Sequence, residues 1–439
     1  MKILVYVSAL LLGGGSLLYG QAVPSGNTTI SSTGSNPNSP PLDGILHYAL
    51  SASQVVQFGF YGSNVTTSST DLSGDVAYTA KSETMPFNMV LAGGVLLSNG
   101  QGQGTSTFWN IGATQGLITR HWAFNVSDSF SFLPQSPTTG LSGIPGVGDL
   151  GAVPVTGPAQ GPGGGVLTFS GNRAINQLSG SAERQLSPAT SISGTGSWSI
   201  IHFFDENAGV SSSGVSGSVA LNRRLDARSS ASVNAVYTTY SYSNTQLSAL
   251  YPDFQTKGIN ASYQRLMSRS VSINLSAGPL WISSSNSSQI PSRLSAAGSA
   301  NLNYTHGLTT ASLGYSRGVN AGSGVLAGAL SDTATGTLAH TYGRKWVASA
   351  DVGYAHSAGL TELLVASSPT AVNEVYETFF GGVQVTHGFT PHLSGYASFT
   401  VTHQSSNYPI PTQNAFTGTS QIFGVGITFT PRSTRLGQF

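Results

Sequence analysis

The fold is decided by a stretch in which apolar and polar side chains alternate at every step: Val271-Ser272-Ile273-Asn274-Leu275-Ser276-Ala277. A period of two places the two sets of side chains on opposite faces of a β-strand. The same alternation recurs at 300–304, 311–316 and 423–429. Helical periodicity is nearly absent, and 48–56 is a candidate for a short helix. The sequence therefore predicts an all-β protein.

Short polar turns separate the alternating segments at intervals of roughly 40 residues. Examples lie at 183–185, 223–228 and 343–345, and longer loops rich in Ser, Gly, Asn and Pro, such as 244–254, lie between them. The repeating unit is thus a β-hairpin with one short end and one long end. That asymmetry is typical of bacterial outer-membrane barrels, which have short periplasmic turns and longer external loops.

The segments number about eighteen, with sixteen as the alternative if the first two lie outside the wall; an even number brings both chain ends to the same side. Each segment is about 11 to 14 residues long, which suffices to cross a bilayer when the strand is tilted. We therefore predict a transmembrane antiparallel up-and-down β-barrel with short periplasmic turns and long external loops.

The composition agrees with such a barrel and excludes several other classes. Charged residues make up 8% of the 439 residues, against about 25% in ordinary soluble domains. The net charge of +1 argues against a nucleic-acid partner, and the lack of cysteine excludes thiol catalysis and cysteine zinc sites. No catalytic or nucleotide-binding motif is present, so we expect no enzyme activity, no cofactor and no metal.

The N-terminal segment has the features of a secretory signal peptide. Lys2 precedes an apolar run, 3–12, and the small residues around Ala22 allow cleavage there, with Gly20 as the alternative. The predicted division is a signal peptide at 1–22, a flexible linker at 23–44, the barrel at 45–431 and a tail at 432–439. The predicted location is the bacterial outer membrane.

One loop, 133–165, is long and rich in Pro and Gly, and strand direction places it on the external side. Structureless loops of this length are usually functional or disordered. We hypothesise that it folds over or into the mouth and narrows the pore; the alternative is a mobile external loop. The candidate pore-loop residues are Pro134, Pro137, Pro145 and Asp149.

Basic residues gather at the short-turn end of the predicted strands, and aromatic residues gather at both ends. Aromatic side chains are expected at both membrane interfaces. The positive charges form either a solvated periplasmic rim or one pole of an axial field that biases ion passage. The basic rim comprises Arg184, Arg223, Arg224, Arg265, Arg269 and Arg344, and the aromatic girdle comprises Tyr240, Trp281, Tyr315, Trp346 and Tyr354.

Two acidic residues break the alternation, because Asp128 and Glu377 share the parity of apolar neighbours. A carboxylate that faces lipid at mid-depth is costly. The sequence allows two explanations: a β-bulge that turns each side chain inward, or a contact between protomers.

The chain ends in Phe439, and a C-terminal aromatic residue resembles the assembly signal of outer-membrane barrels. Together with the 133–151 loop and the closing 424–439 segment, the layout resembles uncharacterised porin-like outer-membrane β-barrel proteins of Gram-negative bacteria. The resemblance implies insertion by the β-barrel assembly machinery.

The expected function is a passive water-filled channel for small polar, mainly neutral solutes, with outer-membrane lipid around it. The alternatives are a conduit for exopolysaccharide export and a structural or adhesive barrel with a blocked lumen. The sequence leaves the oligomeric state open.

Overall fold

The computed structural model describes residues 45–435, apart from 60–64, 81, 83, 100–104, 134–165, 167–171, 205–208, 244–250, 323–324, 327, 344, 364–371, 408–414 and 432–433. All of its regular elements within these ranges are strands. In chain order they are β1 (Ile45–Phe58), β2 (Thr66–Ala80), β3 (Phe87–Asn99), β4 (Ser106–Ile118), β5 (Trp122–Leu133), β6 (Arg173–Ser187), β7 (Thr190–Phe203), β8 (Ser211–Arg224), β9 (Ser229–Ser243), β10 (Phe254–Leu266), β11 (Val271–Ser284), β12 (Arg293–His306), β13 (Thr309–Asn320), β14 (Ala329–Tyr342), β15 (Trp346–Leu363), β16 (Val372–Gly388), β17 (Leu393–Ser406), β18 (Gly418–Phe429) and β19 (Thr434–Arg435).

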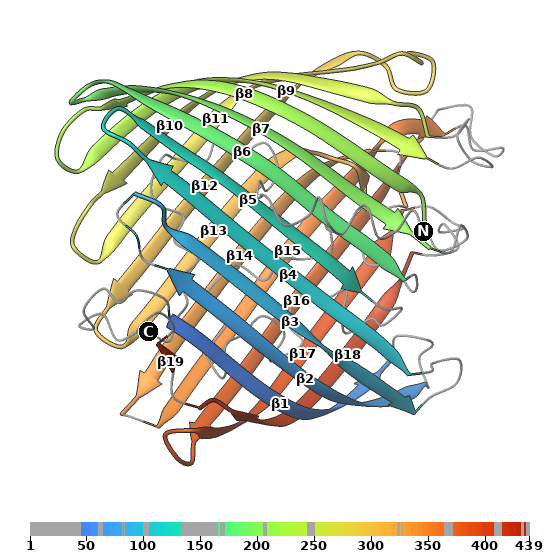
Figure 1. Cartoon of the computed structure of the whole chain (residues 1–439). Helices are drawn as coiled ribbons and strands as arrows, with labels where there is room; N and C mark the ends of the chain where they lie inside the picture. The colour runs from blue at the N-terminus through green and yellow to red at the C-terminus, as the bar shows by residue number, and fades with distance from the viewer. Residues whose placement is uncertain are drawn as a thin grey trace, which may run out of the picture.

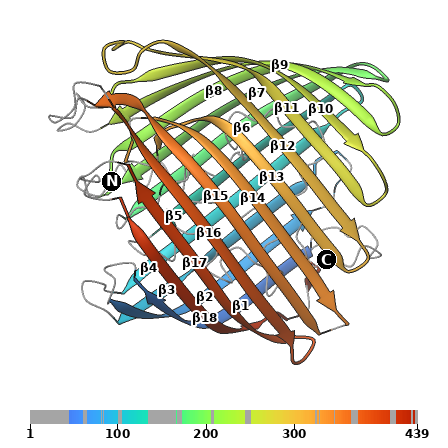
Figure 2. The same ribbon diagram turned by 180° about the vertical axis from the view of Figure 1, so that it is seen from behind.

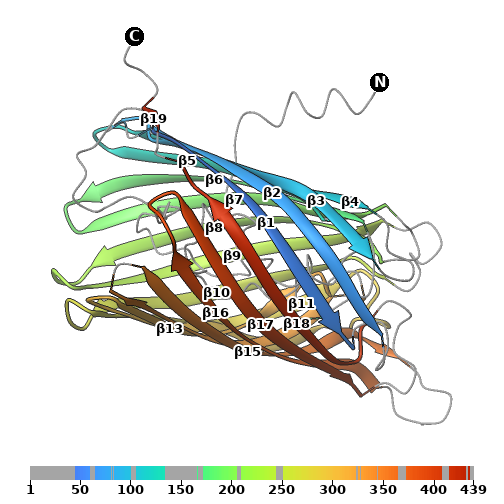
Figure 3. The ribbon, with the colours of Figure 1, turned by 90° about the horizontal axis from the view of Figure 1, so that it is seen from below.

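Each long strand pairs antiparallel with the next, and β1 closes the sheet against β18 from Leu50↔Phe429 to Phe58↔Gln421. The result is a closed barrel of tilted strands (Figures 1 and 2). Eighteen long strands form the wall, which confirms the predicted fold class and strand number. Figure 3 views the wall where its first and last long strands lie side by side.

Two details at the ends of the chain differ from the sequence-based expectation. The candidate helix at 48–56 is wrong, because these residues lie in β1, where all of them pair with β2 and those from Leu50 onward also pair with β18. The predicted tail also contains a short strand, since Thr434 and Arg435 pair with Leu46 and Ile45. The leader and the linker lie outside the described residues, so their boundaries stay predictions.

The two ends of the barrel are built differently, as the hairpin pattern predicts. At one end strands are joined by short turns, such as 188–189 and 307–308, and at the other by longer connections, such as 321–328. Gly307 has a φ of +56°, which favours glycine in the two-residue turn between β12 and β13.

Apolar side chains cover the outside of the wall, which is the reverse of a soluble core. On β11 and β12, for example, Leu275, Trp281 and Leu302 are exposed. The residues between them along each strand point into the barrel and are small or polar, such as Ser276 and Ser299. The wall therefore presents an apolar outer face and a polar inner face, as alternation around a closed cylinder requires.

Candidate functional site

The inner face of the wall is lined by hydroxyl groups that pair across neighbouring strands. In each pair the two residues lie directly opposite one another in the ladder, and their side-chain oxygens are 2.5–2.8 Å apart. Such pairs satisfy one hydrogen bond of each hydroxyl and leave its other bonding positions for water or solute. The pairs are Ser51–Ser73, Thr195–Ser218, Ser197–Ser216, Ser232–Ser262, Ser276–Ser299 and Ser312–Thr337.

The inner face also carries a small number of charged side chains. Carboxylates and guanidinium groups lie on inward positions of the described strands, and Asp71 is almost completely buried. Glu183 accepts a hydrogen bond from Ser191. The inward charged residues of the described strands include Asp71, Asp75, Arg173, Glu183, Arg293, Asp351 and Glu374.

At the long-loop end, an apolar cluster forms inside the barrel. Phe254, Leu280 and Ile282 from β10 and β11 are buried with Ile290, Val319 and Leu360. Tyr240 and Tyr242 of β9 pack against this cluster, and the Tyr240 ring stacks on Phe254 with centroids 4.7 Å apart.

Three tyrosine hydroxyls hold the end of β13 and the connection that follows it against a part of the chain around β9 and the start of β10. Tyr240 donates to the carbonyl of Val319 (3.2 Å), and Tyr242 to that of Ala321 (3.1 Å). Tyr251, just before β10, donates to the carbonyl of residue 325 (3.1 Å). Three strands separate β9 from β13 in the wall, so the end of β13 and its connection must lean across the lumen. We call these three tyrosines the tyrosine clamp.

The Tyr251 hydrogen bond of the clamp is insensitive to pH in the physiological range. Burial raises the pKa of Tyr251 to about 12, and the negative charge of Glu374 acts in the same direction. The hydroxyl therefore stays protonated and keeps donating its hydrogen bond.

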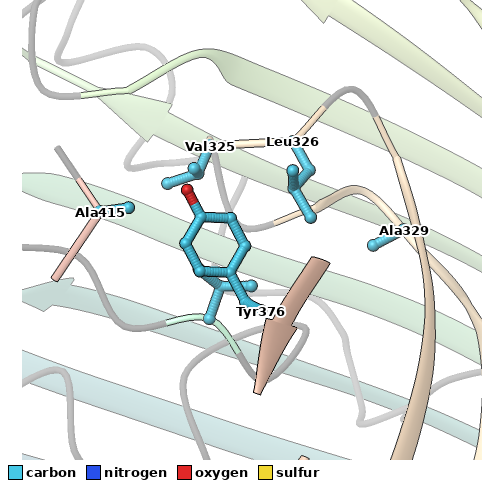
Figure 4. Close-up of a cluster of buried hydrophobic side chains, with 6 residues drawn as sticks. Val325, Leu326, Ala329, Tyr376 and Ala415 are labelled. Atoms are coloured by element: carbon cyan, nitrogen blue, oxygen red, sulfur yellow. The ribbon is translucent and has the colours of Figure 1, made fainter. Parts of the chain in front are cut away.

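A second cluster closes around the same connection (Figure 4). Tyr376 of β16 lies fully buried among Val325, Leu326, Ala329 and Ala415, and its hydroxyl donates to Glu374 of the same strand (2.5 Å). Val166 also belongs to this cluster and is 1% exposed. Val166 lies in the connection between β5 and β6, so one described residue of that connection is buried in the same cluster as residues of the β13–β14 connection.

The candidate pore-loop residues Pro134, Pro137, Pro145 and Asp149 lie outside the described residues. The hypothesis that their loop narrows the pore stays a prediction. The sequence reasoning missed the β13–β14 connection, which the described residues place across the mouth. A signal was available in the sequence: Tyr240 and Tyr242 alternate with the outward-facing residues of β9, so both rings point into the barrel, where most other side chains of the wall are small or polar.

Four of the five predicted girdle residues point outward: Trp281, Tyr315, Trp346 and Tyr354 are 41–48% exposed. Tyr240 differs, because it lies on the opposite parity from the exposed Val233 and Tyr237 and joins the clamp instead. The end of β9 lies at the mouth of the barrel, where the β13–β14 connection covers the inner face. An aromatic ring that points inward there is packed against protein.

The predicted basic rim lies at the short-turn end, where its described members are all exposed: Arg184, Arg223, Arg224, Arg265 and Arg269. Arg344 lies outside the described residues. The guanidinium of Arg184 sits over the Trp122 ring, 5.5 Å from its centroid. The role of this rim in ion passage stays a prediction.

The predicted β-bulge at Asp128 is wrong, because the β5–β6 ladder runs through it without a register shift. Asp128 stays on the outer face, opposite the exposed Leu178. Its Oδ1 accepts a hydrogen bond from Asn176 (2.8 Å), and both side chains are buried. The amide offsets part of the cost of a carboxylate at this position.

The prediction of a β-bulge at Glu377 is wrong as well, because the register shift between β15 and β16 lies elsewhere, between Ala358 and Glu362. Glu377 faces outward, accepts a hydrogen bond from the Tyr354 hydroxyl (3.3 Å) and lies 3.5 Å from Nδ1 of His356. A contact between protomers stays a prediction for both acids.

Among the described residues, no helix is long and apolar enough to span a membrane. No family model matches the chain, and no curated protein matches it.

Among solved structures, the chain is similar to Pseudomonas aeruginosa OpdQ (8% identity, TM-score 0.43), over 89% of this chain and 100% of that one. A BenF-like porin from Pseudomonas fluorescens Pf-5 gives 8% identity and a TM-score of 0.45, over 89% and 100%. The chain is also similar to Acinetobacter baumannii OccAB4, with 10% sequence identity and a TM-score of 0.44; the match covers 90% of this chain and 100% of that one. The functional argument therefore stands on the geometry of the barrel itself.

Proposed function

We propose that this protein is an outer-membrane β-barrel that acts as a passive water-filled channel for small polar, mainly neutral solutes. The observation that carries the proposal is the closed wall with an apolar outer face and an inner face of paired hydroxyls. Such a wall leaves no open sheet edge in the hydrocarbon, and all its backbone bonds can be made between strands. Hydroxyl groups exchange hydrogen bonds with water and sugars without demanding a counter-charge.

This proposal places the short turns in the periplasm and the long connections outside. The chain would reach the outer membrane through its cleaved signal peptide, and the β-barrel assembly machinery would insert it. Export of an exopolysaccharide remains an alternative that no contact in the described residues favours.

The test is conductance of the full chain in planar bilayers, combined with the swelling of liposomes in solutions of uncharged sugars. We expect a steady open current with weak ion selectivity, and swelling rates that fall as the sugar grows. A folded barrel that carries neither current nor sugar would refute the channel.

A barrel with a blocked lumen is the second candidate, because two apolar clusters and the tyrosine clamp occupy the mouth. Conductance separates the two candidates directly. If only variants with a weakened clamp conduct, the wild-type barrel is closed at rest and the blocked-lumen candidate is favoured.

A further inference from the structure

The short-turn end carries an arc of exposed arginines. They occupy the β4–β5, β6–β7, β8–β9 and β10–β11 turns or the strand ends beside them, and all are exposed. Within the described residues none of them is in an ion pair; the two ion pairs present involve Arg317 and His356 at the other end. The arc comprises Arg120, Arg184, Arg223, Arg224, Arg228, Arg265 and Arg269.

Three members of this arc point away from the lumen. In the ladders, Arg184 lies opposite Trp122 and Ile192, which are exposed on the outer face. Arg223 is two residues beyond the exposed Leu221 on β8 and therefore shares its face. Arg265 of β10 lies opposite Ile273 of β11, which has the same parity as the exposed Leu275.

The acids at this end form no ion pair with these arginines within the described residues, although the positive charge of Arg265 contributes to lowering the pKa of Asp226. Asp226, in the β8–β9 turn, accepts hydrogen bonds from the backbone N–H of Arg228 (2.6 Å) and from the Ser229 hydroxyl (2.7 Å). Glu183 of β6 faces inward, where its carboxylate accepts a hydrogen bond from the Ser191 hydroxyl.

Exposed apolar side chains stand beside the arginines. Leu186, Leu225, Leu266 and Met267 are 48–59% exposed at the same turns. A small anion dissolved in water would leave these apolar groups exposed, whereas a lipid interface covers apolar groups and places phosphates beside guanidinium groups at the same depth. The combination matches the headgroup region of a leaflet.

We propose that Arg184, Arg223 and Arg265 form a binding surface for the phosphate groups of anionic phospholipids in the periplasmic leaflet. The guanidinium groups would bind lipid phosphates by charge-assisted hydrogen bonds, and the neighbouring apolar residues would contact the upper acyl chains. The proposal rests on the orientation given under the proposed function but not on conduction, so a barrel that carries no current can still bind these lipids.

The test is lipid retention by the purified full chain in neutral detergent, offered equal amounts of phosphatidylglycerol and phosphatidylcholine and measured by native mass spectrometry. Each basic group near an anionic surface contributes about fivefold to binding. The R184Q/R223Q/R265Q variant should therefore lose its preference for phosphatidylglycerol by about 100-fold, while R184K/R223K/R265K keeps most of it. The preference should also weaken as salt is added.

The matched control is K257Q/R317Q, which removes two outward-facing basic residues near the other end of the wall. This variant should retain phosphatidylglycerol as the wild type does. Equal retention by the triple glutamine variant and the wild type would overturn the proposal. Competition by glycerol phosphate as strong as that by the whole lipid would also overturn it, since the surface would then be a site for a soluble anion. If the triple variant does not fold, R223Q alone should lower the preference by about fivefold.

Discussion

Removal of the tyrosine clamp should release the β13–β14 connection into a wider conformation of the pore. The perturbation is the Y240F/Y242F/Y251F variant, which keeps each ring and its packing and deletes only the three hydroxyl donors. A neutral hydrogen bond contributes a net stabilisation of about 1 kcal/mol, so the three together contribute roughly 3 kcal/mol to docking of the connection. The population of the undocked state should rise by about 150-fold.

The assay is single-channel recording of the wild type, the three single variants and the triple variant. Each single variant should raise the occupancy of a higher-conductance state by about fivefold relative to the wild type. The ratio for Tyr251→Phe should hold from pH 6 to pH 9, because burial raises the pKa of Tyr251 to about 12 and the hydroxyl does not titrate in that range.

Tyr237→Phe is the control, since its hydroxyl donates to Gln255 on the outer face (2.6 Å) and touches no part of the mouth. The reasoning is refuted if the folded triple variant conducts as the wild type does. It is also refuted if Tyr237→Phe changes conductance as much as the clamp variants do.

Two further predictions concern stability. A β-carbon added at Gly353 would lie 2.1 Å from Cζ of Phe380, so Gly353→Ala should lower the free energy of unfolding, measured in urea, by about 1–3 kcal/mol. Gly318 has open space around it, so Gly318→Ala should change that free energy by less than about 0.5 kcal/mol. Equal effects of the two substitutions would contradict this packing. The hydrogen bond from Ser229 holds the pKa of Asp226 below its usual value, so its charged form stabilises the turn at neutral pH, and this contribution is lost as pH falls through the folded-state pKa. Asp226→Asn should remove that part of the acid dependence in urea titrations, and an unchanged pH profile would speak against it.

Local alternation predicts the wall because it is set by neighbours in sequence. The stretch around Ile273 shows both faces of a strand in seven residues, and the closed sheet then follows from the need to pair every backbone group. The same rule applied to β1 would have placed 48–56 in a strand, where Leu50 is exposed and Ala49 is buried.

The contents of the mouth could not be predicted in this way. The Tyr240 hydroxyl donates a hydrogen bond to Val319, which is 79 residues away in the sequence, and the residues around either position do not predict that contact. Parity gives only the direction of Tyr240: it lies an odd number of residues from Tyr237, so the two rings face opposite sides of the wall. What covers an inward ring depends on how the connections fold, which alternation does not encode.

The most direct test of the central claim uses adjacent residues on one strand. The chain has no cysteine, so Ser276→Cys and Leu275→Cys each introduce a single thiol, one on the inner face and one on the outer face of β11. Barrels reconstituted in lipid bilayers are treated with a water-soluble maleimide. We predict that the thiol at 276 is modified and the thiol at 275 is protected by lipid; equal modification of both, or the reverse order, would contradict the account.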